Sequence, residues 1–184
     1  MLELNFHPFP ELRTERLLLR KLAMNDVHEL FFLRSDESVM QFIDRPRAAS
    51  VADVEEFIKK ISATVEANEG IFWAIALNDE PGKLIGTICY WNISPENYRA
   101  ETGYVLHPAH WRKGIMKEAL LKVIGYGFTV MKLHSIEART NPANIASAAV
   151  LESTGFIKEA HFKEDSFFNG VFLDTVVYSN LTPV

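Results

Sequence analysis

The amino-acid sequence predicts an α+β domain in which helices pack on a mixed, mostly antiparallel β-sheet. Two observations support this prediction. Short apolar runs separated by turn residues predict hairpins, and one strand–helix–strand unit in the second half predicts a parallel pair. The predicted order is β-α-α-β-β-β-α-β-α-β-β. The chain has 184 residues and no repeat or compositional boundary, so we expect a single domain over residues 1–184.

The first half of the chain is predicted to contain one strand, two helices and a hairpin. The leucine-rich run near the N-terminus is short, which favours a strand. Ser50 with Asp53 approximates a capping box at a helix start. Turn residues over 78–82 separate two apolar runs and predict a hairpin. The elements are a strand over Leu12–Leu22, a helix from Asn25-Asp26 to Arg34, a helix from Ser50 to Gly70, and strands over Ile71–Leu77 and Leu84–Trp91.

The second half is predicted to contain four strands and two helices. Asn144 is placed to cap a helix start, and Thr154-Gly155 ends that helix. Asn169-Gly170 lies between two apolar or aromatic runs, which is a strong hairpin signal because both turn residues adopt positive φ. The elements are a strand over Ala100–Leu106, a helix from Gly114 to about Val130, a strand over His134–Arg139, a helix over Ile145–Ser153, and strands over Ile157–Phe168 and Val171–Tyr178.

Composition excludes several classes of protein. The formal net charge of -5 disfavours a DNA-binding protein, which needs many basic contacts to phosphates. No apolar run approaches the roughly 20 residues that span a bilayer, and the first residues do not resemble a signal peptide. The single cysteine, Cys89, fits a reducing compartment; it is either a buried strand residue, which we favour, or a catalytic thiol. We expect a cytoplasmic protein without a metal site.

The segment from His107 to Ala119 combines a preceding strand, a basic loop with a glycine, and a following helix. The first N–H groups of a helix lack partners within it, and the helix dipole adds partial positive charge there. Arg112, Lys113 and Gly114 therefore indicate a phosphate site. The alternative is a strand–helix corner with solvated basic residues.

Several motifs occur in a familiar order along roughly residues 10–181. They are Thr14–Arg20, Glu101–Tyr104, Trp111–Ala119, Asn141–Ser147, Gly155-Phe156 and Asn169–Asp174. In this order they resemble the acetyl-CoA-dependent GNAT N-acetyltransferases, in particular the RimJ/RimL-like branch that acetylates the N-termini of ribosomal proteins. The resemblance implies the GNAT fold, with about six to seven strands, about four helices, and central strands that splay apart to bind acetyl-CoA.

The resemblance also implies a set of cofactor-binding residues. The family's acetyl-CoA loop is written Q/R-x-x-G-x-G/A, and its three defined positions are Trp111, Gly114 and Met116 here. Only the glycine matches strictly, and Met116 stands where the family has a small residue. The implied contacts are the backbone of Tyr104, Val105 and Leu106 for the pantetheine arm, the loop residues Trp111, Arg112, Lys113, Gly114, Ile115 and Met116 for the pyrophosphate, and Asn144 and Ser147 on the next helix.

Acetyl transfer to an amine needs a proton acceptor, because an N-terminal amine with a pKa of about 7.7–8.0 is partly protonated at neutral pH. By resemblance, Glu101 is the candidate base and Ser147 the candidate acid for the departing thiolate. Leu151 stands where many GNAT enzymes have a tyrosine acid. The alternatives that remain open are His107 and His134 for the base, and Tyr104 and Tyr126 for the acid.

We therefore expect an N-acetyltransferase that acetylates a primary amine by direct attack in a ternary complex. The acceptor is either a protein N-terminus, such as that of a ribosomal protein, or a small-molecule amine. The acceptor side is expected at Met40–Arg47 and Ser94–Arg99. The alternative is a catalytically degenerate acyl-CoA-binding or regulatory domain. Homodimers are common in this family and among oligomers generally, so a homodimer is one assembly to expect.

Overall fold

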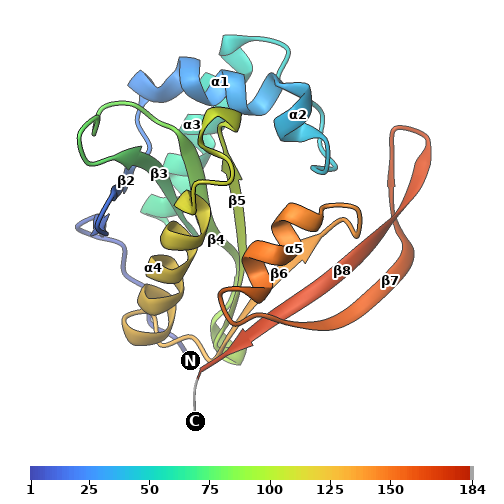
Figure 1. Ribbon diagram of the computed structural model, residues 1–184. Helices are drawn as coiled ribbons and strands as arrows, with labels where there is room; N and C mark the ends of the chain where they lie inside the picture. Colours follow the sequence, from blue (N-terminus) through green and yellow to red (C-terminus); the bar gives the residue numbers. More distant parts are fainter. Residues whose placement is uncertain (183–184) are drawn as a thin grey trace.

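Eight strands form one twisted sheet in the computed structural model, which describes residues 1–182 (Figure 1). Residues 183–184, the end of the expected single domain, lie outside the described part of the chain. The strands are β1 (Leu12–Arg13), β2 (Leu17–Lys21), β3 (Ile71–Leu77), β4 (Gly86–Ser94), β5 (Arg99–Leu106), β6 (Ser135–Thr140), β7 (Ile157–Phe168) and β8 (Val171–Leu181). The α-helices are α1 (Val27–Ser35), α2 (Glu37–Met40), α3 (Val51–Glu66), α4 (Ile115–Thr129) and α5 (Ile145–Glu152).

The strand order is β1-β2-β3-β4-β5-β6-β8-β7. Within the described residues every pair of neighbours is antiparallel except β5 and β6, which are joined through α4 and run parallel. The predicted α+β class and mixed, mostly antiparallel sheet are therefore confirmed. The Asn169-Gly170 hairpin is also confirmed, with φ of 49° and 81° at its two turn residues.

One local prediction was wrong, and one short helix was not predicted. The expected strand over Leu12–Leu22 is split into β1 and β2, which pair antiparallel across a tight turn. The turn is closed by Thr14, whose N–H donates to the Leu17 carbonyl at 2.9 Å and whose hydroxyl accepts from the Leu17 N–H at 3.0 Å. The short helix α2 was not predicted. Its N-cap is Asp36, whose carboxylate accepts hydrogen bonds from the backbone N–H groups of Ser38 and Val39.

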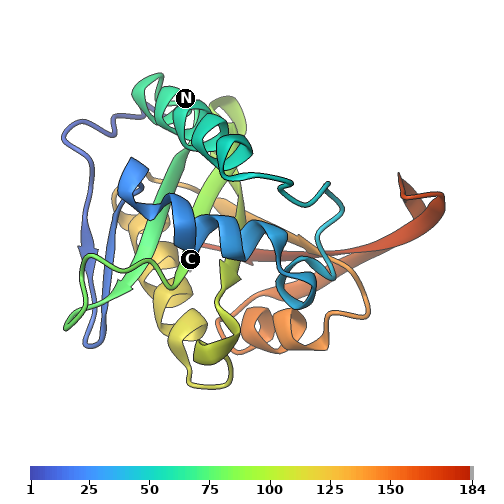
Figure 2. The same cartoon turned by 90° about the horizontal axis from the view of Figure 1, so that it is seen from above.

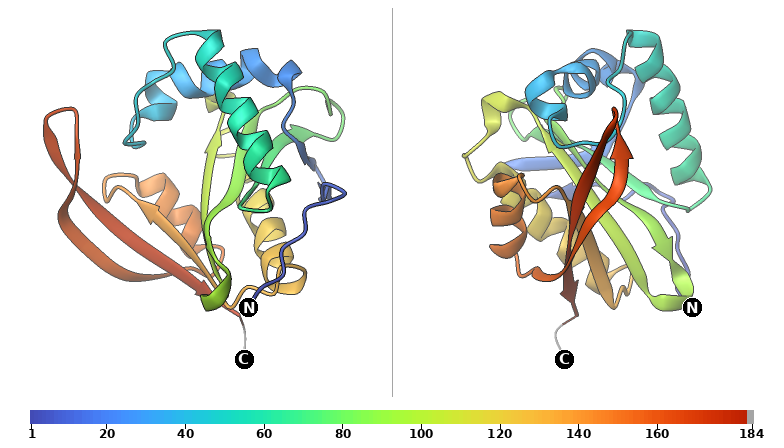
Figure 3. Two further views of the ribbon diagram at one scale, coloured as in Figure 1. Left: turned by 180° about the vertical axis from the view of Figure 1, so that it is seen from behind. Right: turned by 90° about the vertical axis from the view of Figure 1, so that its right-hand side faces the viewer.

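The helices cover both faces of the sheet (Figures 2 and 3). On one face α1 and α3 bury Leu30, Leu33, Val54 and Ile58. The capping box predicted at Ser50 is confirmed and begins α3. On the other face α4 and α5 cover a larger core that contains Trp73, Tyr90, Ala119, Leu120 and Val123. Each large side chain buried there stabilises the fold by about 1.5–3 kcal/mol. Within residues 1–182, no helix is long and apolar enough to cross a membrane.

The sheet opens between β5 and β6. These strands pair only at Arg99–Glu101 with Ser135–Glu137. Beyond Glu101 they diverge toward the end of the molecule where α1 and α2 lie, and α5 follows β6 on the far side of the gap (Figure 1). The free edge of β5 after Glu101 therefore has no strand beside it within the described residues.

Candidate active site

The loop between β5 and α4 presents the start of a helix to solvent. Gly114 is the N-cap of α4 with φ of 72°, a left-handed conformation that suits glycine. No side chain caps α4, and Arg112 and Lys113 beside it are exposed. The unpartnered N–H groups, the helix dipole and two cations together form a site that suits a phosphate. The structure thus brings together the elements of the phosphate site predicted from the sequence.

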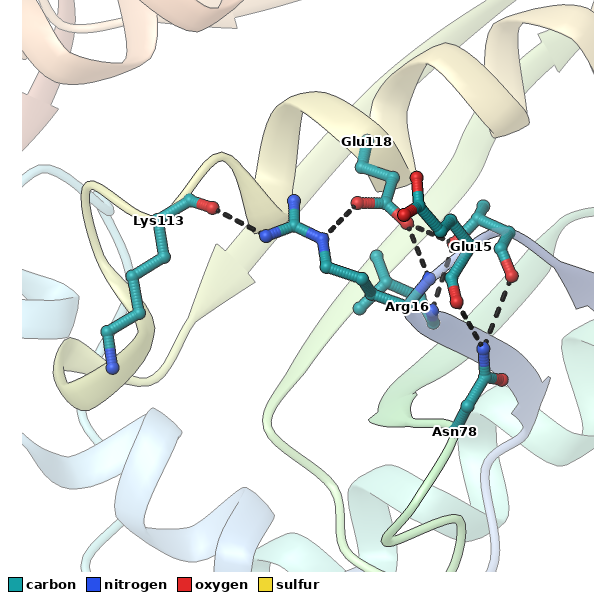
Figure 4. Close-up of polar contacts among 7 residues, drawn as sticks. Glu15, Arg16, Asn78, Lys113 and Glu118 are labelled. Carbon is teal, nitrogen blue, oxygen red and sulfur yellow. Dashed lines mark hydrogen bonds and ion pairs between the residues drawn. The ribbon is translucent and has the colours of Figure 1, made fainter.

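Two side chains hold this loop in place. The indole Nε1–H of Trp111 donates to the carbonyl oxygen of Leu106 at 2.7 Å. Arg16 donates from Nη1 to the carbonyl oxygen of Lys113 at 2.9 Å, and from Nε to Glu118 Oε2 at 2.6 Å (Figure 4). The loop is therefore tied to β5 at its beginning and to the segment between β1 and β2 at its end. Arg16 and Glu118 were not among the predicted site residues.

Glu118 is the centre of this attachment. Its carboxylate also accepts from the Thr14 hydroxyl and, at 3.0 Å, from the Arg16 backbone N–H. Burial raises the pKa of Glu118, but the hydrogen bonds and the Arg16 charge outweigh burial and hold the pKa below its ordinary value. The amide of Asn78 donates to the carbonyl oxygens of Thr14 and Glu15 at 3.2 and 3.1 Å and fixes the same segment (Figure 4).

Met116 does not lie on the phosphate-binding side of the loop. Its side chain is 7% exposed and packs in the large core, as does Ile115 at 4%. The long side chain is therefore directed away from the exposed N–H groups of α4. A methionine at this position therefore leaves the exposed N–H groups of α4 accessible.

The free edge of β5 exposes backbone groups in alternation. The N–H of His107 donates to Ile85 of the β3–β4 connection at 2.8 Å, so the backbone of Val105, two residues earlier, also faces β4. The backbone groups of Tyr104 and Leu106 face the gap instead. The Leu106 carbonyl is already bonded to Trp111, so Tyr104 is left to offer both its N–H and C=O there. Val105 does not fit its predicted role as a backbone partner, and its side chain lines the cavity described next.

A cavity of about 450 Å³ occupies the gap between β5 and β6. Its walls come from α1, α3, the end of α2 and the loop after it, strands β3, β4, β5, β6 and β8, and α5. Alternate residues of β5 point to opposite faces of the sheet. Glu101 and Val105 therefore face the α1–α3 side, and Tyr104 faces the α4–α5 side, where it packs on the large core. The cavity contains residues of both faces, so it connects them through the sheet.

Glu101 lies where the two strands part. It is the last β5 residue paired with β6, and its Oε2 accepts a hydrogen bond from the Asn92 amide at 3.0 Å. Its side chain is half-buried and lines the cavity beside Trp91, its partner on β4. A carboxylate in this position can accept a proton from a group that enters from the α1–α3 side.

Tyr104 and Ser147 meet on the other side of β5. Their hydroxyl oxygens are 2.9 Å apart, and either hydroxyl can be the donor. Burial raises the pKa of Tyr104 to about 12 despite the hydrogen bond between its hydroxyl and that of Ser147, so the phenol is protonated at neutral pH. Asn144 Oδ1 accepts from the Ser147 backbone N–H at 3.0 Å, which confirms Asn144 as the N-cap of α5. The paired hydroxyls can therefore donate a proton into the cavity.

A family described as acetyltransferase (GNAT) domain matches residues 16–157. The chain belongs to the GNAT family. It is 34% identical over 175 residues to the uncharacterised N-acetyltransferase YoaA of Bacillus subtilis, covering 95% of this chain and 98% of YoaA. It is 26% identical over 170 residues to the ribosomal-protein-serine acetyltransferase of Escherichia coli, covering 91% of this chain and 94% of that protein.

The fold is that of solved GNAT structures as well. The spermidine N-acetyltransferase of Vibrio cholerae, determined in complex with CoA and spermine, superposes with a TM-score of 0.81. The alignment covers 91% of this chain and 96% of that one, at 24% identity. The family match and the N-acetyltransferase relatives together show that the protein is a GNAT N-acetyltransferase, an enzyme that transfers an acetyl group from acetyl-CoA.

The GNAT fold places the two alternative histidine bases away from the cavity. The His107 ring stacks on Phe32 with centroids 4.5 Å apart, and its Nδ1 accepts from the Ala109 N–H. His134 begins the approach to β6 at the opposite end of the strands, where its N–H donates to the Tyr98 carbonyl. Neither side chain lines the cavity that contains Glu101.

The structure also places the alternative acid, Tyr126, and the alternative catalytic thiol, Cys89. Tyr126 is buried in the core with its ring 5.5 Å from that of Trp73, and it does not line the cavity. Cys89 does line the cavity, on β4. Burial raises the pKa of its thiol to about 12, so a reactive thiolate is absent at neutral pH.

One of the two expected acceptor loops lies at the cavity of this GNAT enzyme. Met40 and residues 42–45 line it. The segment Ser94–Arg99 does not: it connects β4 and β5 at the end remote from the gap, and Pro95 accepts a hydrogen bond there from the backbone of Leu2. That expectation was wrong because a hairpin turn lies at the closed end of its two strands. Within residues 1–182, no group of three His, Cys, Asp or Glu side chains could hold a metal ion.

Proposed function

We propose that this GNAT enzyme acetylates a primary amine, of a protein N-terminus or a small molecule, by direct attack in a ternary complex. The observation that supports the proposal is the cavity through the sheet. A carboxylate, Glu101, lies on one face, and a pair of hydroxyls, Tyr104 and Ser147, lies on the other. An amine and a thioester that enter from opposite faces would meet between them, and holding two reactants in line contributes much of the rate of such transfers.

The acetyl-CoA side is proposed to extend from the α4 start to α5. The loop over 111–116 would bind the pyrophosphate through its free N–H groups and the charges of Arg112 and Lys113. The backbone of Tyr104 faces the gap and would pair with the pantetheine arm. The Asn144 side-chain oxygen already accepts one hydrogen bond as a cap, so its amide N–H₂ group would be the main contact to this arm. Trp111 and Leu106 would act by shaping the loop, because their polar groups bond to each other.

The proton transfers are assigned to the groups that line the cavity. Glu101 would take a proton from the attacking amine, and Ser147 would give one to the departing thiolate. Tyr104 would support Ser147 by donating a hydrogen bond to the Ser147 hydroxyl oxygen. The phenol of Tyr104 would thus come from β5, whereas the α5 position expected to hold a tyrosine is the buried Leu151. The protonated Cys89 is unsuited to carry the acetyl group, which supports direct transfer over a covalent enzyme intermediate.

The remaining expectations belong to the same proposal. A spermidine acetyltransferase and a ribosomal-protein acetyltransferase are both among the relatives, so both classes of amine are candidates. We propose that the chain acts as one domain over residues 1–184, in the cytoplasm. A homodimer stays a prediction.

The test is release of free CoA thiol when acetyl-CoA is mixed with a panel of amines, followed by Glu101→Gln on the best acceptor. Glutamine keeps the size and the bond to Asn92 but cannot take a proton, so kcat should fall by about 10²–10⁴ while acetyl-CoA binding is unchanged. The defect should shrink as pH rises above the amine pKa, about 7.7–8.0 for an N-terminus, since the free amine needs no base.

Glu96→Gln is the matched control, because Glu96 is an exposed carboxylate in the β4–β5 turn that does not line the cavity. A kcat for Glu101→Gln within about threefold of the parent at every pH would exclude Glu101 as the base, given the size of the effect expected. If acetyl-CoA binds but no amine of the panel causes release of the CoA thiol, the alternative is supported, an acyl-CoA-binding domain without catalysis.

A further inference from the structure

Two arginines on the α1–α3 side of the cavity have no counter-charge. Arg34 ends α1 and Arg45 lies in the loop after α2, and both line the cavity. Within residues 1–182, neither guanidinium has an ion-pair or hydrogen-bond partner; each lies over an aromatic ring instead. The Arg34 guanidinium carbon is 3.8 Å from the centroid of the Phe57 ring, and that of Arg45 is 5.0 Å from the Trp91 ring.

Most other arginines of the described residues do have a hydrogen-bond or ion-pair partner. Arg20, the other arginine with substantial burial, is bonded to both oxygens of Asp26 at 2.6 and 2.8 Å. Arg16 pairs with Glu118, and Arg99 and Arg139 both pair with Glu137. Only one further guanidinium in the described part lacks any such partner, that of Arg112 in the loop proposed to bind pyrophosphate.

The segments that carry Arg34 and Arg45 are held together. The Ala48 N–H donates to the Arg34 carbonyl at 2.9 Å, which holds the loop of Arg45 against the end of α1. Burial, and then repulsion from Arg45, lower the pKa of Arg34. Two like charges in a partly desolvated wall are unfavourable until an anion joins them.

The pair lies near the candidate base. Arg45 covers the Trp91 ring, and Trp91 is directly opposite Glu101 in the β4–β5 register. Cys89 lies two pairs further along the β4–β5 register, opposite Gly103, and its side chain is on the same face of β4 as that of Trp91. A molecule with its amine at Glu101 would therefore bring a neighbouring substituent to the arginines.

The acids of this wall do not neutralise the pair. Burial, and then repulsion from Asp165 of β7, raise the pKa of Asp44. Asp174 accepts from His161 at 2.7 Å and from the Glu164 N–H at 2.9 Å. Neither aspartate is within ion-pair distance of Arg34 or Arg45 in the described part of the chain.

We infer that Arg34 and Arg45 form a carboxylate subsite, and that the acceptor is an amine that carries a carboxylate close to the amino group. The inference rests on the proposed function and narrows its acceptor. A polyamine, which has no anion, would leave the two guanidiniums unpaired. A free amino acid supplies the carboxylate itself, and a protein N-terminus supplies it through an acidic residue near its first position.

The experiment compares matched acceptors that differ only in this carboxylate. One pair is L-serine and L-serinamide, and a second is the peptide amides Ser-Glu-Ala-Ala and Ser-Gln-Ala-Ala; spermidine is the cationic reference. The parent should prefer the carboxylate member of at least one pair by about tenfold to a hundredfold in kcat/KM, as expected for a charge-assisted hydrogen bond. The pair that responds identifies the source of the carboxylate.

Arg45→Gln should abolish this preference by raising KM for the carboxylate member, with kcat and the amide member little changed. Arg45 is exposed, so the variant should fold normally. Arg47→Gln is the control, since Arg47 lies in the same loop, faces Glu37 at 3.9 Å and does not line the cavity. Equal use of both members of each pair, a preference for spermidine, or a preference that survives Arg45→Gln would overturn the inference.

Binding measured by calorimetry in the presence of CoA separates this result from a failure of the proposed function. If no amine causes release of the CoA thiol from acetyl-CoA, the proposed activity is wrong. Selective binding of the carboxylate members that is lost in Arg45→Gln would still support the subsite, and binding without selectivity would refute it.

Discussion

Replacing Glu118 with glutamine is expected to loosen the acetyl-CoA loop and lower the stability of the fold. Glu118 accepts hydrogen bonds from the Thr14 hydroxyl, the Arg16 backbone N–H and the Arg16 Nε–H. A glutamine oxygen can still accept the first two. Its NH₂ group would face the Arg16 guanidinium, so the charge-assisted bond is lost, and Arg16 is then free to release the Lys113 carbonyl (Figure 4).

The magnitude follows from the exposure of the pair. A hydrogen bond to a charged group contributes about 1.5–3 kcal/mol when shielded. Here the Arg16 side chain is 45% exposed and that of Glu118 is 20% exposed, so solvent reduces the value. We expect a loss of about 1–2 kcal/mol, which for a chain of this size lowers Tm by about 2–8 °C. In Glu118→Gln, acetyl-CoA binding would have to immobilise the freed Arg16 side chain. We expect this entropic cost to weaken the affinity for acetyl-CoA by about twofold to tenfold.

The pH dependence gives this prediction a definite sign. The pKa of Glu118 in the folded protein lies below its ordinary value. Its stabilisation is therefore complete above the ordinary pKa of about 4.3 and is lost as pH falls through the lower folded value. The difference in Tm between the parent and Glu118→Gln should be full at neutral pH and shrink in acid.

Thermal unfolding from neutral pH down to acid, with acetyl-CoA titrations at neutral pH, measures both effects. Glu56→Gln is the control, because Glu56 pairs with Lys59 at 2.9 Å but the two side chains are 75% and 59% exposed. Equal Tm changes in the two variants, or an unchanged acetyl-CoA affinity in Glu118→Gln, would show that this ion pair neither stabilises the fold specifically nor positions the loop.

Three other substitutions follow from the site. Tyr104→Phe removes the hydroxyl that bonds Ser147, so kcat should fall by about tenfold to a hundredfold with acetyl-CoA binding intact; steady-state kinetics with an unchanged rate would exclude the phenol. Gly114→Val strains a residue with φ of 72° and should abolish the stabilisation of about 2.7 kcal/mol expected at an acetyl-CoA concentration of 100 times Kd, and a surviving thermal shift would place the cofactor elsewhere. Met116→Ala should cost about 2–5 kcal/mol in denaturant unfolding, because it empties a core position, with little change in acetyl-CoA affinity.

The features that the sequence predicted correctly have local causes. The capping box of Ser50 and Asp53, the N-cap at Asn144 and the Asn169-Gly170 turn each depend on residues a few positions apart. The burial of Met116 also had a local signal. Met116, Ala119, Leu120 and Val123 recur at helical spacing and are all buried, so the pattern already indicated that this methionine faces the core.

The features that the sequence could not predict have distant causes. The attachment of the β1–β2 turn to α4 depends on Glu118, which lies 104 residues after Thr14. The hydroxyl pair of Tyr104 and Ser147 joins a strand to a helix 43 residues later. Neither contact has a periodic or capping signal in the sequence. Such contacts are set by the packing of α4 and α5 on the sheet, which local propensity does not specify.

The two proposed proton-transfer groups of β5 face opposite sides of the sheet because of their spacing along the strand. Glu101 and Tyr104 are separated by an odd number of positions, so their side chains lie on opposite faces of the strand. A shift of β5 by one residue would exchange the two faces and bring the carboxylate to the α4–α5 side. The register is held by the antiparallel pairing of β4 and β5 from Gly86–Leu106 to Trp91–Glu101 and by three pairs with β6. The same pairing that ends at Glu101 opens the gap, so under the proposed function β5 would lie between the two substrates and present a different functional group to each.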